Sequence, residues 1–133
     1  MGKTAEIETD ESTGWTIIST PFTGIFNDLI EIYIRVEGSN ILMSDDGETI
    51  NNLESIGINF SKSQNRRRIL ETILLNYGVI LDKGELKTEC IISDFPKRKH
   101  LFLEALIGVN DMFMLSEHNV ASVFKDDVVQ GDV

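Results

Sequence analysis

The chain has 133 residues, of which 41% are hydrophobic and 26% are charged, and this composition is typical of a soluble globular protein with one self-sufficient core. Its 22 acidic and 12 basic residues give a formal net charge of −10. Such a charge argues against unselective binding to nucleic acid or to anionic membranes.

The first fourteen residues are polar and acidic, and they offer little apolar surface to offset the entropy of ordering. We therefore predict a flexible acidic leader over residues 1–14. The same stretch lacks the apolar run of a signal peptide, and no segment approaches the ~20 apolar residues of a membrane span. Cys90 is the single cysteine, so an intramolecular disulfide is excluded. These features together predict a cytoplasmic protein that does not enter a membrane.

A strand and a hairpin are expected next. Residues 15–20 are β-prone, and Pro21 is expected to end that strand because proline has no N–H to donate. In the segment Leu29–Gly47, apolar residues at every second position from Ile30 to Val36 alternate with polar ones, as in a half-buried strand. A turn at residues 38–40 returns the chain, which predicts a β-hairpin.

Two helices follow this hairpin. Residues 48–55 have helical spacing and are followed by Gly57, so they predict a short helix. The second helix can begin at Ser61 or Ser63 as N-cap, and Gly78 occupies the position of a left-handed C-cap. Its apolar stripe consists of Ile69, Leu70, Ile73, Leu74 and Tyr77.

A second hairpin and the longest helix complete the predicted domain. Residues 79–81 lead through a turn at residues 82–84 into an alternating strand, Glu85–Ile92, which should extend the sheet. Pro96 lies in the expected first turn of a long apolar helix. Gly108 lies inside this helix, where glycine costs about 1 kcal/mol relative to alanine, and it predicts a close approach of another backbone.

These elements predict one α+β domain over residues 15–124, followed by an acidic tail at residues 125–133. Its small, mostly antiparallel sheet would be built from the two hairpins, with the helices packed on one face. The predicted core consists of Ile32, Ile34, Ile73, Leu74, Phe102, Leu106 and Val109.

Several short segments together resemble a known family. They are residues 20–22, 28, 32–34, 44–47, 53, 66–75, 77–79, 84–86 and 110–113. In these segments the chain resembles the uncharacterised bacterial and phage family called domain of unknown function 1828. The resemblance implies a bacterial or phage origin and an ordered fold, and it implies no mechanism. A second uncharacterised domain often follows in that family, and here it would begin near residues 122–124.

The adjacent acids Asp45 and Asp46 form the first candidate site. With Glu85, and with Asp28 or Glu31 as a further ligand, they could hold a divalent cation through hard oxygen ligands. The alternative, which we favour, is turn chemistry, because aspartate and glycine suit a strand-to-helix turn and a carboxylate suits a helix N-terminus.

Glu85 and Lys87 form the second candidate site, since Glu-x-Lys on a strand has the outline of a metal-dependent nuclease core. However, a helix separates Asp46 from Glu85, whereas such a core usually joins its acids by a short hairpin. We therefore favour an exposed, solvated strand face.

Two basic clusters form the third candidate. They are Arg66, Arg67 and Arg68 in one helix, and Lys97, Arg98 and Lys99 in the other. Cations in the first turns of a helix oppose its dipole, and a bound anion would relieve that conflict. We therefore expect an anion-binding or partner-binding role, most clearly if both clusters form one patch. The alternative is neutralisation by nearby acids such as Glu71 and Asp94.

No Ser/His/Asp or Cys/His set is legible, so we expect a binding protein without a cofactor rather than an enzyme. The preferred hypothesis is a small acidic interaction or regulatory protein of a bacterium, phage or mobile element. It would bind a host or phage protein, for example as an inhibitor of a nucleic-acid-handling or defence enzyme. The alternative is a nucleic-acid-binding or nuclease-like protein that uses the basic helix starts and Asp45/Asp46 with Glu85/Lys87. The sequence predicts no particular oligomeric state.

Overall fold

The computed structural model describes residues 6–10, 12 and 14–130, with side chains given for residues 7, 9, 12 and 14–112. Its strands are β1 (Glu6–Asp10), β2 (Trp15–Thr23), β3 (Leu29–Glu37), β4 (Asn40–Ser44), β5 (Ile80–Asp82) and β6 (Glu85–Ile91). Its helices are α1 (Glu48–Ser55), α2 (Gln64–Tyr77), the short 3₁₀ helix η1 (Ile92–Asp94) and α3 (Phe95–Gln130).

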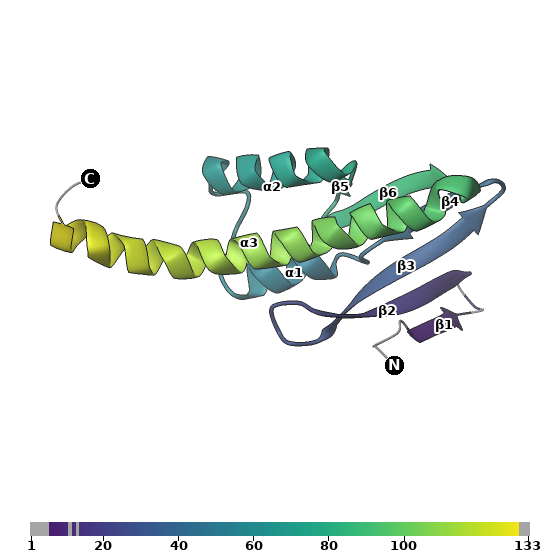
Figure 1. Ribbon diagram of the computed structural model, residues 1–133, viewed down its shortest axis with the longest axis horizontal. Helices are drawn as coiled ribbons and strands as arrows, with labels where there is room; N and C mark the ends of the chain where they lie inside the picture. Colours follow the sequence, from purple (N-terminus) through teal and green to yellow (C-terminus); the bar gives the residue numbers. More distant parts are fainter. Residues whose placement is uncertain (1–5, 11, 13, 131–133) are drawn as a thin grey trace.

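The six strands form one sheet in the order β1-β2-β3-β4-β6-β5 (Figure 1). Every neighbouring pair is antiparallel. Both predicted hairpins are present, as β3–β4 and β5–β6, and β4 pairs with β6 to join them. The α+β fold class and the antiparallel sheet are therefore confirmed.

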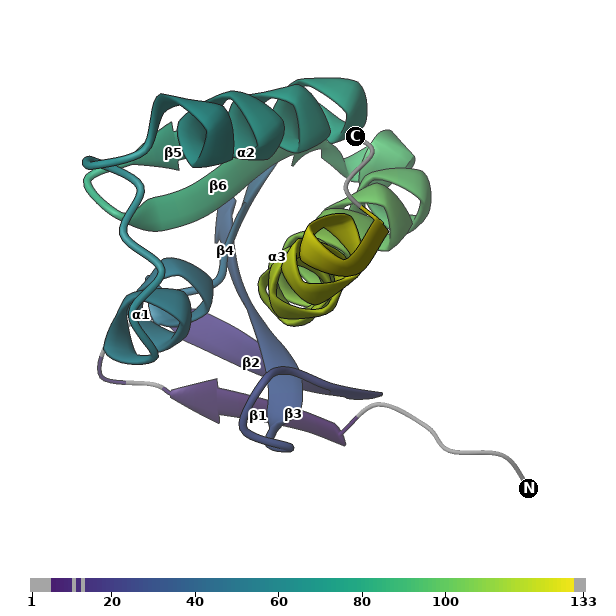
Figure 2. The same ribbon diagram turned by 90° about the vertical axis from the view of Figure 1, so that its left-hand side faces the viewer.

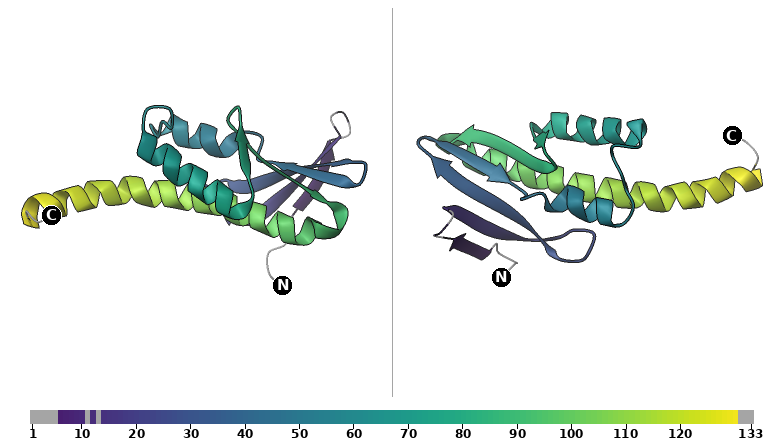
Figure 3. Two further views of the ribbon diagram at one scale, coloured as in Figure 1. Left: turned by 90° about the horizontal axis from the view of Figure 1, so that it is seen from above. Right: turned by 180° about the vertical axis from the view of Figure 1, so that it is seen from behind.

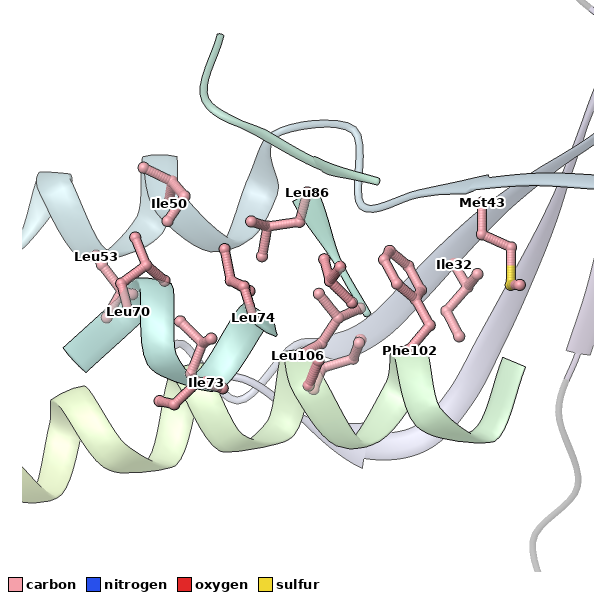
Figure 4. Packing of buried hydrophobic residues seen from close by; sticks show 14 of the residues in the cluster. Ile32, Met43, Ile50, Leu53, Leu70, Ile73, Leu74, Leu86, Phe102 and Leu106 are labelled. Carbon is pink, nitrogen blue, oxygen red and sulfur yellow. The ribbon is translucent and has the colours of Figure 1, made fainter. Parts of the chain in front are cut away.

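The long helix α3 crosses the inner face of the sheet, with α2 beside it and α1 near the ends of the central strands (Figures 1 and 2). The core lies between these helices and the sheet, and all seven residues predicted for it are buried. Figure 4 shows Ile32 and Met43 of the sheet facing Phe102 of α3, with Leu70 and Leu74 of α2 closing the cluster.

Local sequence signals set the helix ends. Ser63, one of the two predicted N-caps, accepts a hydrogen bond from the Arg66 N–H at the start of α2. Gly78 has φ of 69°, and this left-handed conformation ends α2 as predicted. The α1 helix spans the predicted residues, Glu48–Ser55.

Two expectations about the first strands are wrong. Glu6–Asp10, predicted as part of a flexible leader, forms β1 and pairs with β2. Pro21 does not end β2, because it lies where the β2–β3 register shifts between Ser19 and Thr23. There the Thr20 hydroxyl donates to the Ile30 carbonyl at 2.8 Å, so a side chain supplies a hydrogen bond where proline cannot.

The last helix is longer than predicted. Residues 125–130, expected to form part of an acidic tail, continue α3 to Gln130, and residues 131–133 lie outside the described chain. No glycine or proline lies between Val109 and Gln130 to end the helix. This C-terminal part of α3 projects beyond the sheet and the other helices (Figure 3). Within the described residues, no helix is long and apolar enough to span a membrane.

The prediction for Gly108 is corrected by the packing of α3 against α2. A Cβ at this position would meet the Ile73 Cγ2 atom at 3.8 Å, an ordinary van der Waals contact with a side chain. The helix approaches closely enough to touch Ile73, and it leaves room for a methyl group.

Candidate functional site

Asp45 is a structural carboxylate. It is 2% exposed, and its Oδ1 atom accepts hydrogen bonds from the Gly47 N–H at 2.8 Å and the Leu86 N–H at 2.9 Å. Its Oδ2 atom accepts from the Thr49 N–H at 3.0 Å. The side chain thus satisfies donors in the first turn of α1 and joins the β4–α1 turn to β6. This geometry supports the turn interpretation of Asp45.

Asp46 and Glu85 also have local partners. Asp46 has φ of 59°, and its N–H donates to the Ser44 hydroxyl oxygen at 2.9 Å. The Ser44 hydroxyl in turn donates to the Glu85 carboxylate. In the part of the chain that the structure describes, no group of three or more His, Cys, Asp or Glu side chains is placed to hold a metal ion.

Lys87 is held at the surface by two acids. Its Nζ atom lies 3.1 Å from Asp82 Oδ2 and 3.7 Å from Glu85 Oε1. The hydrogen bond to Asp82 raises the pKa of Lys87 most, and the charge of Glu85 raises it further. This cation is therefore engaged with two acids of the β5–β6 hairpin.

Carboxylates gather where β3 begins and α1 starts, and we call Asp28, Glu31, Asp46 and Glu48 the acidic cluster. Tyr33 lies at its edge, where its hydroxyl donates to Glu31 Oε1 at 3.3 Å. Burial raises the pKa of Tyr33 above its ordinary value, and the charges of Glu31, Glu48 and Asp46 raise it further. Three of these carboxylates therefore lie close enough to Tyr33 to affect its ionisation.

Glu48 shows the same effect most directly. Partial burial raises the pKa of its carboxyl group, and the neighbouring charges of Glu31, Asp45, Asp46 and Asp28 add to the shift. A cavity beside this cluster has a volume of about 20 Å³ and is bordered by Asn52, Asn110 and three of its acids. It is the size of one water molecule, so a cationic partner would meet the cluster at the surface.

The two basic clusters lie at opposite ends of α2. Arg66, Arg67 and Arg68 occupy its first turns, whereas the Arg98 Nη1 atom donates to the Tyr77 carbonyl at its last turn, at 3.3 Å. Arg67 and Tyr77 are ten positions apart, or about 15 Å along a helix. The clusters therefore do not form one compact patch, and Arg98 serves as a cap for the C-terminus of α2.

Charges of opposite sign are nevertheless segregated between elements. Residues 61–78 and 94–112, which contain α2 and the first half of α3, hold seven cations and four acids. Residues 14–60 and 79–93, which contain β2–β6 and α1, hold three cations and ten acids. Counted over these residues, which leave out β1 and residues 113–130, the helix layer has a net charge of +3 and the sheet side has a net charge of −7.

One face of the sheet is covered by no helix of the described residues, as the right-hand view of Figure 3 shows. Directly paired residues of antiparallel strands share a face. The register of the strands places one row across this face, through Ile17, Tyr33, Ser44, Lys87 and Ile80.

A second row of this open face runs beside the first. In it the Arg35 guanidinium lies 5.8 Å from the centre of the Trp15 ring, and Leu42 pairs with Arg35 on one side and Glu89 on the other. Neither Trp15 nor Tyr33 was predicted from the sequence as a site residue. The alternation of apolar and polar residues in β3 could have indicated Tyr33, because it places this residue and its neighbours at every second position on the face opposite to Ile32 and Ile34.

A family model described as domain of unknown function DUF1828 matches residues 20–109. This range extends from the bulge in β2 to the last core residue of α3, so it includes most of the sheet, α1, α2 and the acidic cluster. No curated protein and no solved structure matches the chain.

Proposed function

The chain belongs to the family described as domain of unknown function DUF1828, and we propose that it is an interaction protein whose acidic sheet side binds a basic surface of a partner protein. The observation that carries this proposal is the segregation of charge, −7 on the sheet side against +3 on the helix layer. A surface chosen for solubility alone would intersperse the two signs.

Such a surface favours fast and selective association with a positively charged partner. Complementary potentials steer the encounter and suppress wrong partners. Basic surfaces of this kind are common where proteins hold nucleic acid. An acidic protein that covers such a surface would compete with the nucleic acid, and we propose this inhibitory role as its regulatory action in a bacterium, phage or mobile element.

Direct nucleic-acid binding is the weaker alternative. The helix layer carries the required cations, but its two clusters are separated along α2 and Arg98 is engaged at the Tyr77 carbonyl. The carboxylates of Asp45 and Glu85 are likewise engaged in hydrogen bonds within the fold.

The test compares charge reversals on the two sides of the molecule. The immobilised chain is exposed to bacterial lysate at low and moderate salt, as wild type, as Glu31→Lys/Glu48→Lys, and as the control Arg66→Glu/Arg67→Glu. We expect a captured protein whose binding weakens with salt and is lost in the acidic-side variant alone. Capture that is lost only in the control variant would overturn the proposal.

The alternative is tested in parallel with labelled DNA and RNA, with and without Mg²⁺. We expect neither binding nor cleavage. Binding that falls by roughly 0.9 log units per log unit of salt for each phosphate neutralised, and that is lost in Arg67→Glu, would favour the alternative. Cleavage abolished by both Asp46→Ala and Glu85→Ala would establish a nuclease.

A further inference from the structure

We infer that the open face of the sheet, centred on Trp15 and Tyr33, is the docking surface, and that its partner presents lysine or arginine side chains around an apolar contact. This inference rests on the proposed function, since it assigns a location and a chemistry to the same binding event. The face comprises the outward residues of β2, β3, β4 and β6, with β5 at one edge.

The centre of this face is apolar and half-exposed. Trp15, Ile17, Tyr33 and Leu42 occupy adjacent positions of its two rows, and all four retain partial exposure. The helices bury the other face, where Ile32 is 0% exposed. Large amphipathic side chains such as tryptophan and tyrosine at the centre of a contact supply most of the binding energy in typical interfaces.

The rim of the face is acidic, and its cations are already engaged. Arg35 contacts both the Trp15 ring and Glu37, the latter at 3.3 Å, and Lys87 is held by Asp82 and Glu85. The outward positions of β3, β4, β5 and β6 hold two cations, Arg35 and Lys87, against five acids. These acids are Glu31, Glu37, Asp82, Glu85 and Glu89.

The acidic cluster continues this rim beyond the start of β3. Tyr33 connects the two, because Glu31 of the face and Asp46 and Glu48 of the β4–α1 region all raise its pKa. A partner that presents cations around an apolar contact would therefore meet carboxylates around the centre of the open face and at the start of β3. This charge complementarity selects a basic protein surface.

The size of the face suits a protein partner. The five strands of the face contain 33 residues. At a rise of about 3.4 Å per residue and a strand spacing of about 4.8 Å they cover roughly 540 Å², which is about two-thirds of the roughly 800 Å² that each partner buries in an interface of standard size. The acidic cluster at the start of β3 adds to this area.

A second copy of the chain is the competing occupant. A symmetric dimer through this face would place one acidic rim against the other, and like charges in contact cost several kcal/mol. The chain carries a formal charge of −10, which adds long-range repulsion to that contact. Charge therefore favours a basic partner over self-association.

The test uses the fluorescence of Trp15, the only tryptophan in the chain. The full chain is titrated with three peptides of ten residues: alternating lysine and leucine, lysine alone, and alternating glutamate and leucine. We expect the lysine–leucine peptide to shift Trp15 emission and to bind at least tenfold more tightly than the glutamate–leucine peptide. Backbone NMR shifts should change most in β2, β3, β4 and β6.

Matched variants locate the effect. Leu42→Ser and Glu89→Lys alter the open face, and each should weaken lysine–leucine binding at least fivefold. Leu75→Ser is the control, because Leu75 is an 80% exposed residue on α2 in the helix layer, and it should leave binding unchanged. If Leu42→Ser lowers the melting temperature, Glu89→Lys at the exposed rim still tests whether the open face binds the peptide.

The outcomes separate this inference from the function on which it rests. If neither lysine peptide binds at any position, the proposed function fails. If a lysine peptide binds but the NMR shifts fall on α1 or the helix layer and Trp15 emission is unchanged, the inference alone is overturned. Concentration-dependent Trp15 emission without peptide, with a dimer in light scattering, would overturn it in favour of a second copy.

Discussion

The two faces of β3 differ in what determines their side chains. Ile30, Ile32 and Ile34 face the helices and are buried, and their contacts depend on volume and shape. One residue along, Glu31 and Tyr33 face outward. There the Glu31 carboxylate accepts hydrogen bonds from Ser19 and Tyr33, and burial together with nearby carboxylates raises the pKa of Tyr33. The inner face thus stabilises the fold, and the outer face is available for recognition. Changes on the two faces should therefore affect different measurements.

The largest effect is expected on the inner side. Leu106 of α3 is 0% exposed within the core, so Leu106→Ala should lower the free energy of unfolding by roughly 2–5 kcal/mol. Denaturant unfolding followed by circular dichroism measures this change. Leu75→Ala, at an exposed position of α2, is the control and should cost under 1 kcal/mol. A loss below about 0.5 kcal/mol for Leu106→Ala would contradict the core assignment.

The next largest effect tests whether Asp45 is structural. Asp45→Ala would leave the buried N–H groups of Thr49 and Leu86 and the partly buried N–H group of Gly47 without their acceptor. Each loss at a buried group costs about 1–3 kcal/mol before relaxation. We expect a net loss of roughly 2–4 kcal/mol. Asp45→Asn retains one acceptor oxygen and should fall between alanine and wild type. Mg²⁺ should not change the unfolding midpoint of the wild type. If Mg²⁺ stabilises the wild type and this stabilisation disappears in Asp45→Ala, Asp45 is a metal ligand.

The different predictability of the two faces has a physical cause. The spacing of Ile30, Ile32 and Ile34 is local in sequence, so it predicted the hairpin and the buried positions. The apposition of Trp15 and Arg35 depends on how β2 pairs with β3, and a register between strands is not contained in either strand alone.

The same reasoning explains two features that the sequence did not predict. The antiparallel packing of α3 on α2 brings Arg98, predicted as an anion ligand because it begins a helix, to the Tyr77 carbonyl. β1 has only Ile7 as a large apolar residue, and Ile7 is 67% exposed. Its backbone pairing with β2 defines the strand, so side-chain periodicity could not reveal it.

A smaller effect of opposite sign is expected where α3 meets α2. Gly108→Ala should raise the free energy of unfolding by up to about 1 kcal/mol, because alanine favours the helix and the new methyl group finds ordinary contact with Ile73. Thermal unfolding measures the change. Gly24→Ala is the contrasting variant, since its Cβ would lie 3.1 Å from the Asn110 Oδ1 atom, and it should destabilise. A destabilised Gly108→Ala would mean that the helices pack more tightly than described.

The smallest effect concerns the outer side, and it depends on pH. Partial burial and the surrounding acids raise the pKa of Glu48, although the first turn of α1 by itself favours an ionised carboxylate. The folded chain therefore binds the Glu48 proton more tightly than the unfolded chain. The free energy of unfolding must then fall as the pH rises from the unfolded to the folded pKa.

Glu48→Gln should accordingly stabilise the protein at pH 7 by a few tenths of a kcal/mol, a size set by the exposure of the side chain. The gain should shrink below the pKa of Glu48, where the wild-type carboxyl is itself neutral. Denaturant unfolding at pH 7 and pH 4 measures both values, with Glu54→Gln on the same helix as the control. A gain that is equal at both pH values, or that grows at pH 4, would show that the acidic cluster does not repel the Glu48 charge. Its carboxylates would then be solvated separately, and the rim would attract a basic partner less strongly.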